Sequence, residues 1–206
     1  MTHERQSMKG QVLFILGGPG VGKGTQCTAL TNASSNDSNN NFKYVHLSAG
    51  DLLRAERCRP NSQYAPIINQ NIQQGTIVPS QITIDLLKAA MKESADKCDY
   101  FLIDGFPRKV PQGLAFEEQI SPCAALLFFD CPEDVLVNRL LKRSQTSGRD
   151  DDNLDSIKKR LVTYRNETLP VIEHYGNQGK VYKIDCNDSI EAITEKVNEI
   201  LCQIHQ

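Results

Sequence analysis

A glycine-rich stretch with a single lysine is the part of this sequence whose residue types best suit chemistry. Residues 17–25 read GGPGVGKGT, follow directly on the apolar run VLFIL and precede a helical pattern. In a strand–loop–helix of this kind, loop N–H groups and the helix dipole converge where glycine lets a phosphate approach closely. Lys23 adds a mobile positive charge for the β- and γ-phosphates. The stretch therefore predicts a site for the phosphates of a nucleotide.

The loop departs from the common G-x-x-x-x-G-K-[ST] pattern at one position. Gly24 occupies the Ser/Thr place, and Thr25 follows one residue later. In the common pattern that hydroxyl is bound to Mg²⁺. We therefore expect no direct metal ligand from the protein here.

Two further segments carry ionic side chains in suggestive places. Asp104 ends an apolar run and is followed by GFPR, so it is expected at the carboxyl end of a strand, where parallel sheets bind ligands. Ser48 and Asp51 fit a capping box, which by itself predicts only a helix start. Arg54 lies one turn later. Arg54 and Arg108 could each grip a phosphate with two parallel hydrogen bonds, which a lysine cannot do.

Four more arginines lie on or beside late helical patterns. Arg139 and Arg143 are four residues apart and share a helix face. Arg149 and Arg160 flank an acidic turn, DDD at 150–152. Spacing alone leaves a solvated helix surface as the simpler interpretation of all four.

The elements that must position these residues follow from apolar patterning. Five short apolar runs bounded by Gly, Pro or Asp predict buried strands at 12–16, 44–47, 100–104, 124–130 and 181–185. Helical patterns cover 25–30, 51–57, 80–95, 132–143, 154–175 and 190–204. Strands apolar on both faces that alternate with helices predict an α/β fold, a doubly wound five-stranded parallel sheet covered on both sides.

Two segments fall outside this alternation. Residues 32–41 form an Asn/Ser/Asp tract, which predicts a surface loop after the first helix. Residues 59–79 hold three prolines and a glycine around a weakly apolar helix and have no strand of their own. We expect them to leave the sheet.

Composition excludes several classes of function. The chain has 206 residues and a formal charge of -2, which favours one domain and gives no reason to expect nucleic acid or a membrane as partner. Its first ten residues lack the apolar core of a secretory signal, and no stretch of about 18 apolar residues follows. Seven unclustered cysteines favour reduced thiols in a cytoplasmic or nuclear protein over disulfides or a zinc site.

Taken together, these segments resemble one known family. GGPGVGKGTQ resembles the phosphate loop of the adenylate kinase superfamily, with its Gly-Lys-Gly-Thr variant. Further matches follow in order along nearly the whole chain: HLSAGDLLRAE (46–56), SQY (62–64), GTIVP (75–79), FLIDGFPR (101–108), FFDCPE (128–133) and SGRDDDN (147–153). They are similar to the eukaryotic UMP/CMP kinase branch, and to fungal uridylate kinases most of all.

This resemblance implies a nucleoside monophosphate kinase fold with a short lid. Residues 1–9 would be a tail, 48–77 a monophosphate-binding insertion, 144–152 the lid, and 10–47, 78–143 and 153–206 the core. The implied reaction moves the γ-phosphate of ATP, with Mg²⁺, onto UMP or CMP, and onto dUMP and some AMP. Short-lid relatives imply a monomer.

The resemblance also assigns site residues. For ATP it implies Gly18, Gly20, Val21, Gly22, Lys23, Gly24, Thr25, Arg139 and Arg143. For the monophosphate it implies Ser48, Ala49, Arg54, Ile77, Val78, Gly105, Arg108, Gln112, Arg149 and Arg160. Catalysis would rest on Lys23, Arg108, Arg143, Arg149 and Arg160, and Asp104 would hold water ligands of Mg²⁺. The acceptor is already an anion, so no general base is needed.

The choice of base leaves an alternative open. Ala49 matches the UMP/CMP branch, where adenylate kinases tend to carry Thr, whereas Gln112 occurs in both. A kinase acting mainly on AMP is therefore the alternative. A GTPase-type switch is a remote one, because its N-K-x-D and D-x-x-G motifs do not occur in the sequence. A catalytically idle scaffold is disfavoured because every expected cation is present.

Overall fold

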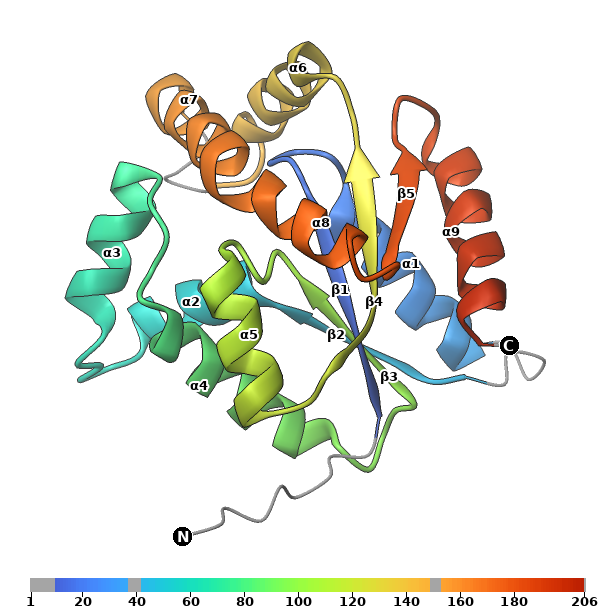
Figure 1. Ribbon diagram of the computed structural model, residues 1–206. Coiled ribbons are helices and arrows are strands. Elements are labelled where there is room, and N and C mark those ends of the chain that lie inside the picture. The colour runs from blue at the N-terminus through green and yellow to red at the C-terminus, as the bar shows by residue number, and fades with distance from the viewer. Residues whose placement is uncertain (1–9, 37–41, 149–152, 206) are drawn as a thin grey trace, which may run out of the picture.

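The protein is described by a computed structural model that covers residues 10–36, 42–148 and 153–205. Its strands and helices alternate along most of the chain (Figure 1). In chain order they are β1 (Gln11–Gly17), α1 (Lys23–Asn36), β2 (Tyr44–Ser48), α2 (Ala49–Cys58), α3 (Ala65–Gln74), α4 (Ser80–Ser94), β3 (Tyr100–Asp104), α5 (Val110–Gln119), β4 (Cys123–Asp130), α6 (Glu133–Ser144), α7 (Leu154–Thr163), a π-helical segment (Tyr164–Thr168), α8 (Leu169–Gly176), β5 (Val181–Asp185) and α9 (Ile190–Ile204).

The described strands form one sheet in the order β2-β3-β1-β4-β5, and every neighbouring pair is parallel. Val12 to Leu16 are at most 1% exposed, as expected for a strand covered on both faces. The predicted doubly wound parallel sheet is confirmed. All five predicted strands exist, with ends that differ by a residue or two.

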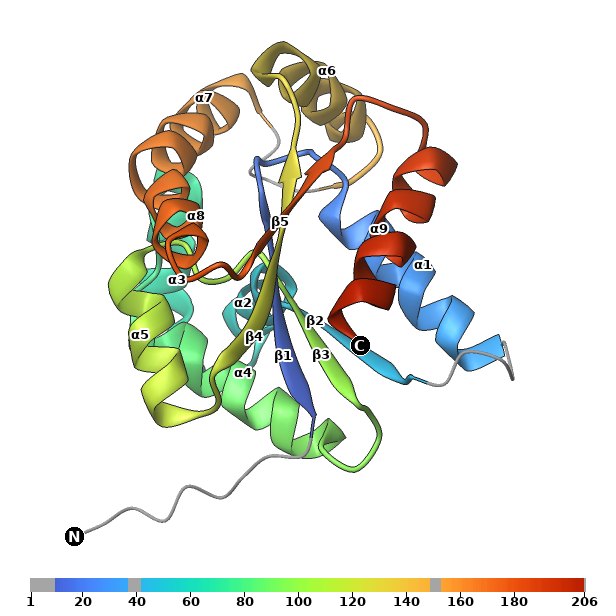
Figure 2. The same cartoon turned by 45° about the vertical axis from the view of Figure 1, so that its right-hand side comes forward.

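Helices cover both faces of the sheet, as Figure 2 shows, with α1 and α9 on one side and α4, α5 and α8 on the other. Each face has its own apolar core. Leu13 and Ile15 pack in the cluster that includes residues of α1, α6, α7 and α9. Phe14 points the other way, against the rings of Phe116 and Tyr175 from α5 and α8, with centroids 5.4 and 5.7 Å away. The carboxyl ends of the strands remain uncovered by these cores.

Helix α3 lies away from the sheet (Figure 1). It packs through Ile68, which is fully buried, in a small third cluster with Leu53 of α2 and Ile82 of α4. Gly75 ends α3 in the left-handed conformation, with φ 65°. The predicted excursion of residues 59–79 from the sheet therefore takes the form of α3 and its flanking loops.

The first helix is longer than predicted. It continues to Asn36, so the expected loop at 32–41 is wrong for residues 32–36, and residues 37–41 lie outside the described part of the chain. Once the buried face at Cys27 and Leu30 has formed the helix, each added residue costs little, even where Asn and Ser are poor helix formers.

Two more helical details differ from the sequence-based expectation. The single helix predicted at 154–175 is divided by the π-helical segment, directly before Pro170, whose ring cannot donate a backbone hydrogen bond. Helix α5 has no counterpart among the predicted helices, because its buried positions include Gln112 and Gly113 and so do not form an apolar stripe. Among the described residues, no helix is long and apolar enough to cross a membrane.

Candidate active site

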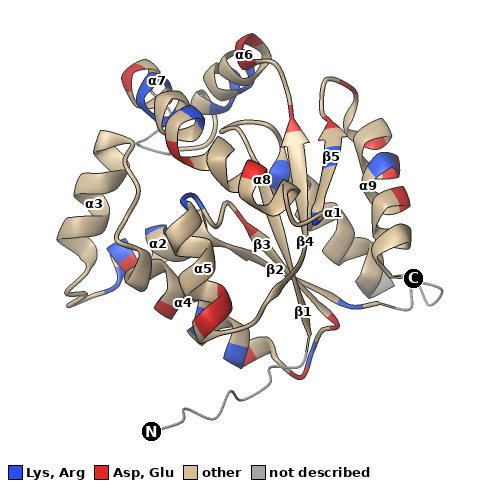
Figure 3. Ribbon diagram, viewed as in Figure 1, with Lys and Arg blue, Asp and Glu red and all other residues tan. Residues whose placement is uncertain are grey.

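A cleft of about 490 Å³ lies at the carboxyl ends of the strands, over the glycine-rich loop. Most of the predicted site residues line it. They come from the loop after β1, from the ends of β2 and β3, and from α6 and α7: Gly20, Gly22, Lys23, Gly24, Thr25, Ser48, Arg54, Asp104, Gly105, Arg108, Arg139, Arg143 and Arg160. Figure 3 shows basic residues on α6 and α7, above the ends of the strands.

The glycine-rich loop wraps closely between β1 and α6. Gly20 has φ +85°, and a Cβ at this residue would lie 2.7 Å from Cγ of Leu140, so only glycine fits. Lys23 Nζ donates hydrogen bonds to the carbonyls of Gly17 (2.9 Å) and Gly18 (3.1 Å). The ammonium group is thereby held over its own loop, facing the cleft.

The surroundings of Lys23 lower its pKa to about 8. Desolvation is the main cause, and the nearby Arg108 and Arg160 guanidinium groups lower the pKa further, while Asp104 opposes them. A bound phosphate beside Nζ would favour the charged form and raise the pKa again.

This shift predicts a proton-linked affinity for ATP. Below about pH 8 Lys23 is already charged, whereas above pH 8 the free protein has lost this proton and must regain it on binding. We expect ATP binding at about pH 9 to take up close to one proton more than at about pH 7.5, and the affinity to fall as the pH rises through 8. Titration calorimetry in buffers of different ionisation enthalpy measures the uptake. Equal uptake by wild type and Lys23→Met at the higher pH would contradict the assignment.

Arg108 is held from three directions. Its Nε donates to the carbonyl of Gly105 (3.0 Å), its backbone N–H donates to Gln112 Oε1 (2.8 Å), and its carbonyl accepts from Thr168 Oγ1 (3.3 Å). Such support fixes where the guanidinium group can reach. Asp104 lies close by and is 8% exposed.

Asp104 has a partner that the sequence did not reveal. His46 Nε2 lies 3.4 Å from Asp104 Oδ2, and both residues line the cleft. The interpretation of His46 as no more than a packed strand-end residue is therefore incomplete. Its place beside Asp104 follows from the parallel pairing of β2 with β3, in which Ser48 is opposite Asp104.

The capping prediction for α2 is confirmed, since Ser48 Oγ accepts the N–H of Asp51 at 3.2 Å. Asp51 also binds Arg54, with Oδ1 2.5 Å from one terminal nitrogen of the guanidinium group. This carboxylate holds Arg54 at the edge of the cleft.

A second, smaller cavity of about 70 Å³ adjoins the cleft. Gly50, Arg54, Gly75, Gly105, Arg108 and Arg160 line both cavities. Its other walls include four predicted residues, Ala49, Ile77, Val78 and Gln112, together with Thr83 and Asn71, which were not predicted. Gln112 and Thr83 are 2% and 4% exposed, so the cavity has polar groups in an otherwise apolar setting.

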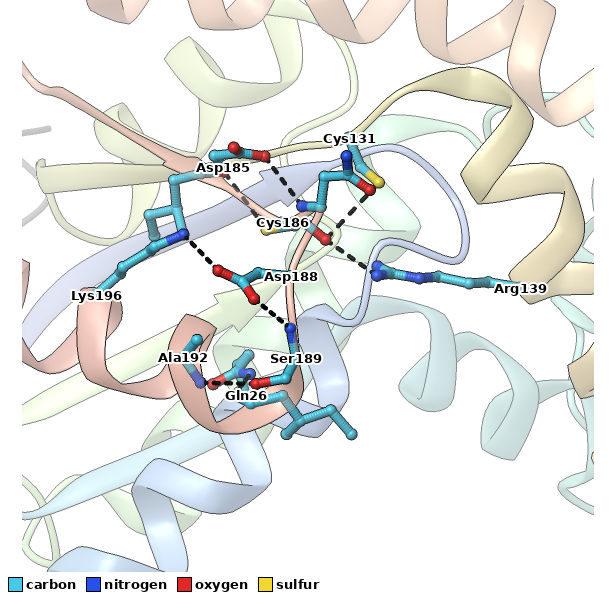
Figure 4. Close-up of polar contacts among 12 residues, drawn as sticks. Gln26, Cys131, Arg139, Asp185, Cys186, Asp188, Ser189, Ala192 and Lys196 are labelled. Atoms are coloured by element: carbon cyan, nitrogen blue, oxygen red, sulfur yellow. Dashed lines mark hydrogen bonds and ion pairs between the residues drawn. The ribbon is translucent and has the colours of Figure 1, made fainter.

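Arg139 joins two parts of the chain at the other end of the cleft. Its guanidinium group donates to the carbonyl of Cys186 (3.0 Å), as Figure 4 shows, and to that of Val21 (3.3 Å). Cys131 Sγ contacts the same Cys186 carbonyl at 3.8 Å, from the residue that follows β4. Arg139 thus closes the space between the glycine-rich loop and the turn after β5.

Three predicted residues are not found in either cavity. Val21 is buried in the core, and Gly18 turns its Cα toward Leu136, so both serve the loop from behind. Arg149 lies outside the described residues. Conversely, Thr28, Thr163, Tyr164 and Thr168 line the cleft without having been singled out from the sequence.

A parallel sheet whose first strand ends in a lysine-bearing glycine loop, faced by arginines from neighbouring elements, is the architecture of a P-loop nucleotide-binding protein. The chain belongs to the adenylate kinase family, whose family model matches residues 15–180.

Comparison with individual relatives narrows this result. The chain is 47% identical to the uridylate kinase of Saccharomyces cerevisiae over 92% of its length and 90% of that protein. It is 45% identical to the UMP-CMP kinase of Lentinula edodes, over 98% of the chain and 91% of the relative. It is also 44% identical to adenylate kinase 1 of Schistosoma mansoni, over 98% and 97%.

Proposed function

We propose that this protein is an ATP-dependent nucleoside monophosphate kinase that transfers the γ-phosphoryl group of ATP to UMP or CMP, giving UDP or CDP and ADP. The observation that carries the proposal is the convergence of Lys23 and five arginines on one cleft, beside a second cavity shaped by the monophosphate segment. The kinases named for UMP and CMP among its relatives support the same reaction.

The cleft supplies what phosphoryl transfer needs, which is charge neutralisation and in-line positioning. Loop N–H groups and Lys23 would hold the phosphates of ATP. Arg54 and Arg108, from the other side, would hold the acceptor phosphate, and Arg143 and Arg160 would neutralise the charge that develops between the two. A phosphate monoester oxygen attacks directly, so no side chain has to remove a proton.

The donor groups in the cleft also fit Mg²⁺ that arrives with ATP. Asp104 is a buried carboxylate next to the loop, and a Cβ at Gly24 would lie only 3.7 Å from its Oδ2. One carboxylate acting through water suits Mg²⁺, which keeps most of its waters and is otherwise bound by phosphates. Among the described residues, no cluster of three or more His, Cys, Asp or Glu could hold a metal by itself. When bound, Mg²⁺ would neutralise phosphate charge, and Asp104 would orient its waters.

The adjoining cavity would receive the acceptor base. Gln112 Oε1 is occupied by the N–H of Arg108, so the amide nitrogen is the end of this side chain that can donate to a base. Ala49 is small and buried, which leaves room without adding a hydroxyl. These features support UMP or CMP as the acceptor.

Two segments would move during turnover. We propose that residues 48–77 are the monophosphate-binding insertion and residues 144–152 the lid, and that they close together over both substrates. Closure would exclude water, which otherwise competes as acceptor. We further propose that the protein works as a cytoplasmic monomer, present also in the nucleus.

A panel of acceptors tests the proposal. ADP release from ATP and Mg²⁺ is measured by a coupled assay with UMP, CMP, dUMP, AMP and GMP, and without acceptor. We expect UMP or CMP to give the highest kcat/KM, with dUMP slower and AMP weak. A clear preference for AMP would make the protein an adenylate kinase in activity, and equal ADP release without acceptor would contradict the kinase proposal.

A further inference from the structure

We propose that Thr163 is a positioning residue that holds the monophosphate segment closed against α7 through the carbonyl of Gly75. Thr163 Oγ1 donates to this carbonyl at 2.8 Å, across 88 positions of sequence. The inference rests on the proposed function, since it assigns a task to this contact in binding the acceptor.

Gly75 transmits the contact to the whole of α3. Its own N–H bonds back to the carbonyl of Ile72 (3.2 Å), and the next N–H, of Thr76, bonds to that of Asn71 (3.0 Å). This left-handed cap fixes the direction of the Gly75 carbonyl relative to the helix. A bond made to that carbonyl therefore holds the end of α3 and not a loose loop.

The two backbones meet with no space to spare. A Cβ added to Gly75 would lie 2.9 Å from Cβ of Lys159 and 3.2 Å from the backbone nitrogen of Arg160. Positive φ and this close approach both require glycine. Contact therefore depends on the absence of a side chain at the end of α3 and on the presence of a hydroxyl on α7.

The contact lies at the junction of the two cavities. Gly75 and Arg160 line both of them, and Thr163 lines the cleft. When α3 is docked, Arg160 is next to the segment that carries Ile77 and Val78. Docking thus completes the acceptor site and places one of the proposed phosphate-binding arginines beside it.

The π-helical segment explains why a hydroxyl is available there. Thr163 directly precedes this segment, and Thr168 at its end donates to the carbonyl of Arg108 (3.3 Å). Widening of the helix at this point turns two threonines toward the cleft, one to the monophosphate segment and one to the Arg108 loop. Such π-helical insertions are frequent at functional sites.

Thr163→Val keeps the shape of the side chain and removes the hydroxyl. We expect the KM for UMP to rise about 2- to 12-fold, the range that loss of one ordinary hydrogen bond produces. Saturating UMP restores the docked state by mass action, so kcat should stay within about twofold. The KM for ATP should not change, and Thr163→Ser should restore the KM for UMP.

Gly75→Ala tests the contact from the other side, and Gly179→Ala is its matched control. Gly179 has φ +69°, close to that of Gly75, but nothing lies within 4 Å of a Cβ there. Both variants carry the same backbone strain, so both should lower the melting temperature. Only Gly75→Ala should raise the KM for UMP, by at least as much as Thr163→Val.

Several outcomes would overturn the inference. These are an unchanged KM for UMP in Thr163→Val, an equal rise in the KM for ATP, a loss of kcat with no change in KM, or a failure of Ser to rescue. Wild-type turnover is measured first with each acceptor. If AMP proves to be the acceptor, the variants are compared with AMP, so failure of the proposed base preference leaves this test intact.

Discussion

Replacing Lys23 by methionine is expected to lower kcat for UMP phosphorylation by about 10² to 10³-fold, the usual cost of removing one preorganised charge from a transfer site. Methionine has a similar length and no charge, so the loop can keep its shape. Coupled assays at saturating ATP and UMP measure the effect. Since desolvation lowers the pKa of Lys23, the folded protein without phosphate disfavours the charged form of this side chain. The melting temperature at about pH 7 should therefore not fall.

Lys97→Met is the control for this substitution. Lys97 is exposed in the turn between α4 and β3, at the opposite end of the strands from the cleft. Its loss should leave kcat unchanged. A Lys23→Met protein that retains most of the wild-type kcat would show that the glycine-rich loop works without its lysine, and would contradict a role of Lys23 in the transfer step.

Replacing Arg108 is expected to have an effect of comparable size. Arg108→Ala should lower kcat/KM for UMP by about 10² to 10³-fold, because a positioned cation near the transferring group is lost. Arg108→Lys should recover little of this loss, since an ammonium group cannot bind a phosphate through two parallel bonds. The effect on ATP binding, measured by calorimetry, should be much smaller.

An arginine outside the cleft provides the comparison. Arg165 is half exposed on the π-helical segment and lies 3.5 Å from Glu133. Arg165→Ala should cost no more than about twofold in kcat/KM, as expected for an exposed ion pair. Equal losses in the two alanine variants would mean that net charge, and not the place of Arg108, sets the rate.

Sequence patterning sufficed for the sheet because its strands are buried on both faces. Runs such as Val12 to Leu16 are apolar at every position, and periodicity identifies them without knowledge of neighbours. Helix α5 escaped detection for the opposite reason. Gln112 is buried there because it bonds to the backbone of Arg108, a tertiary contact that no local pattern reports.

The candidate site was predictable where a motif fixes the backbone. Lys23, Asp104 and Arg108 follow strand ends, so their meeting at one edge of the sheet follows from parallel pairing alone. Thr163 belongs to another category. Its hydroxyl reaches Gly75 only because the helix predicted at 154–175 is interrupted after α7 and because α3 returns to that place. Neither event leaves a signal in the residues nearby.

The phosphoryl group itself can be followed from donor to acceptor. ATP labelled in its γ-phosphoryl group is mixed with Mg²⁺, UMP and the protein, and the products are separated by chromatography. We expect the label to appear in UDP, with little inorganic phosphate, because the closed cleft presents the monophosphate and not water to ATP. Label released mainly as inorganic phosphate, or retained in ATP, would contradict direct transfer between two nucleotides in this cleft.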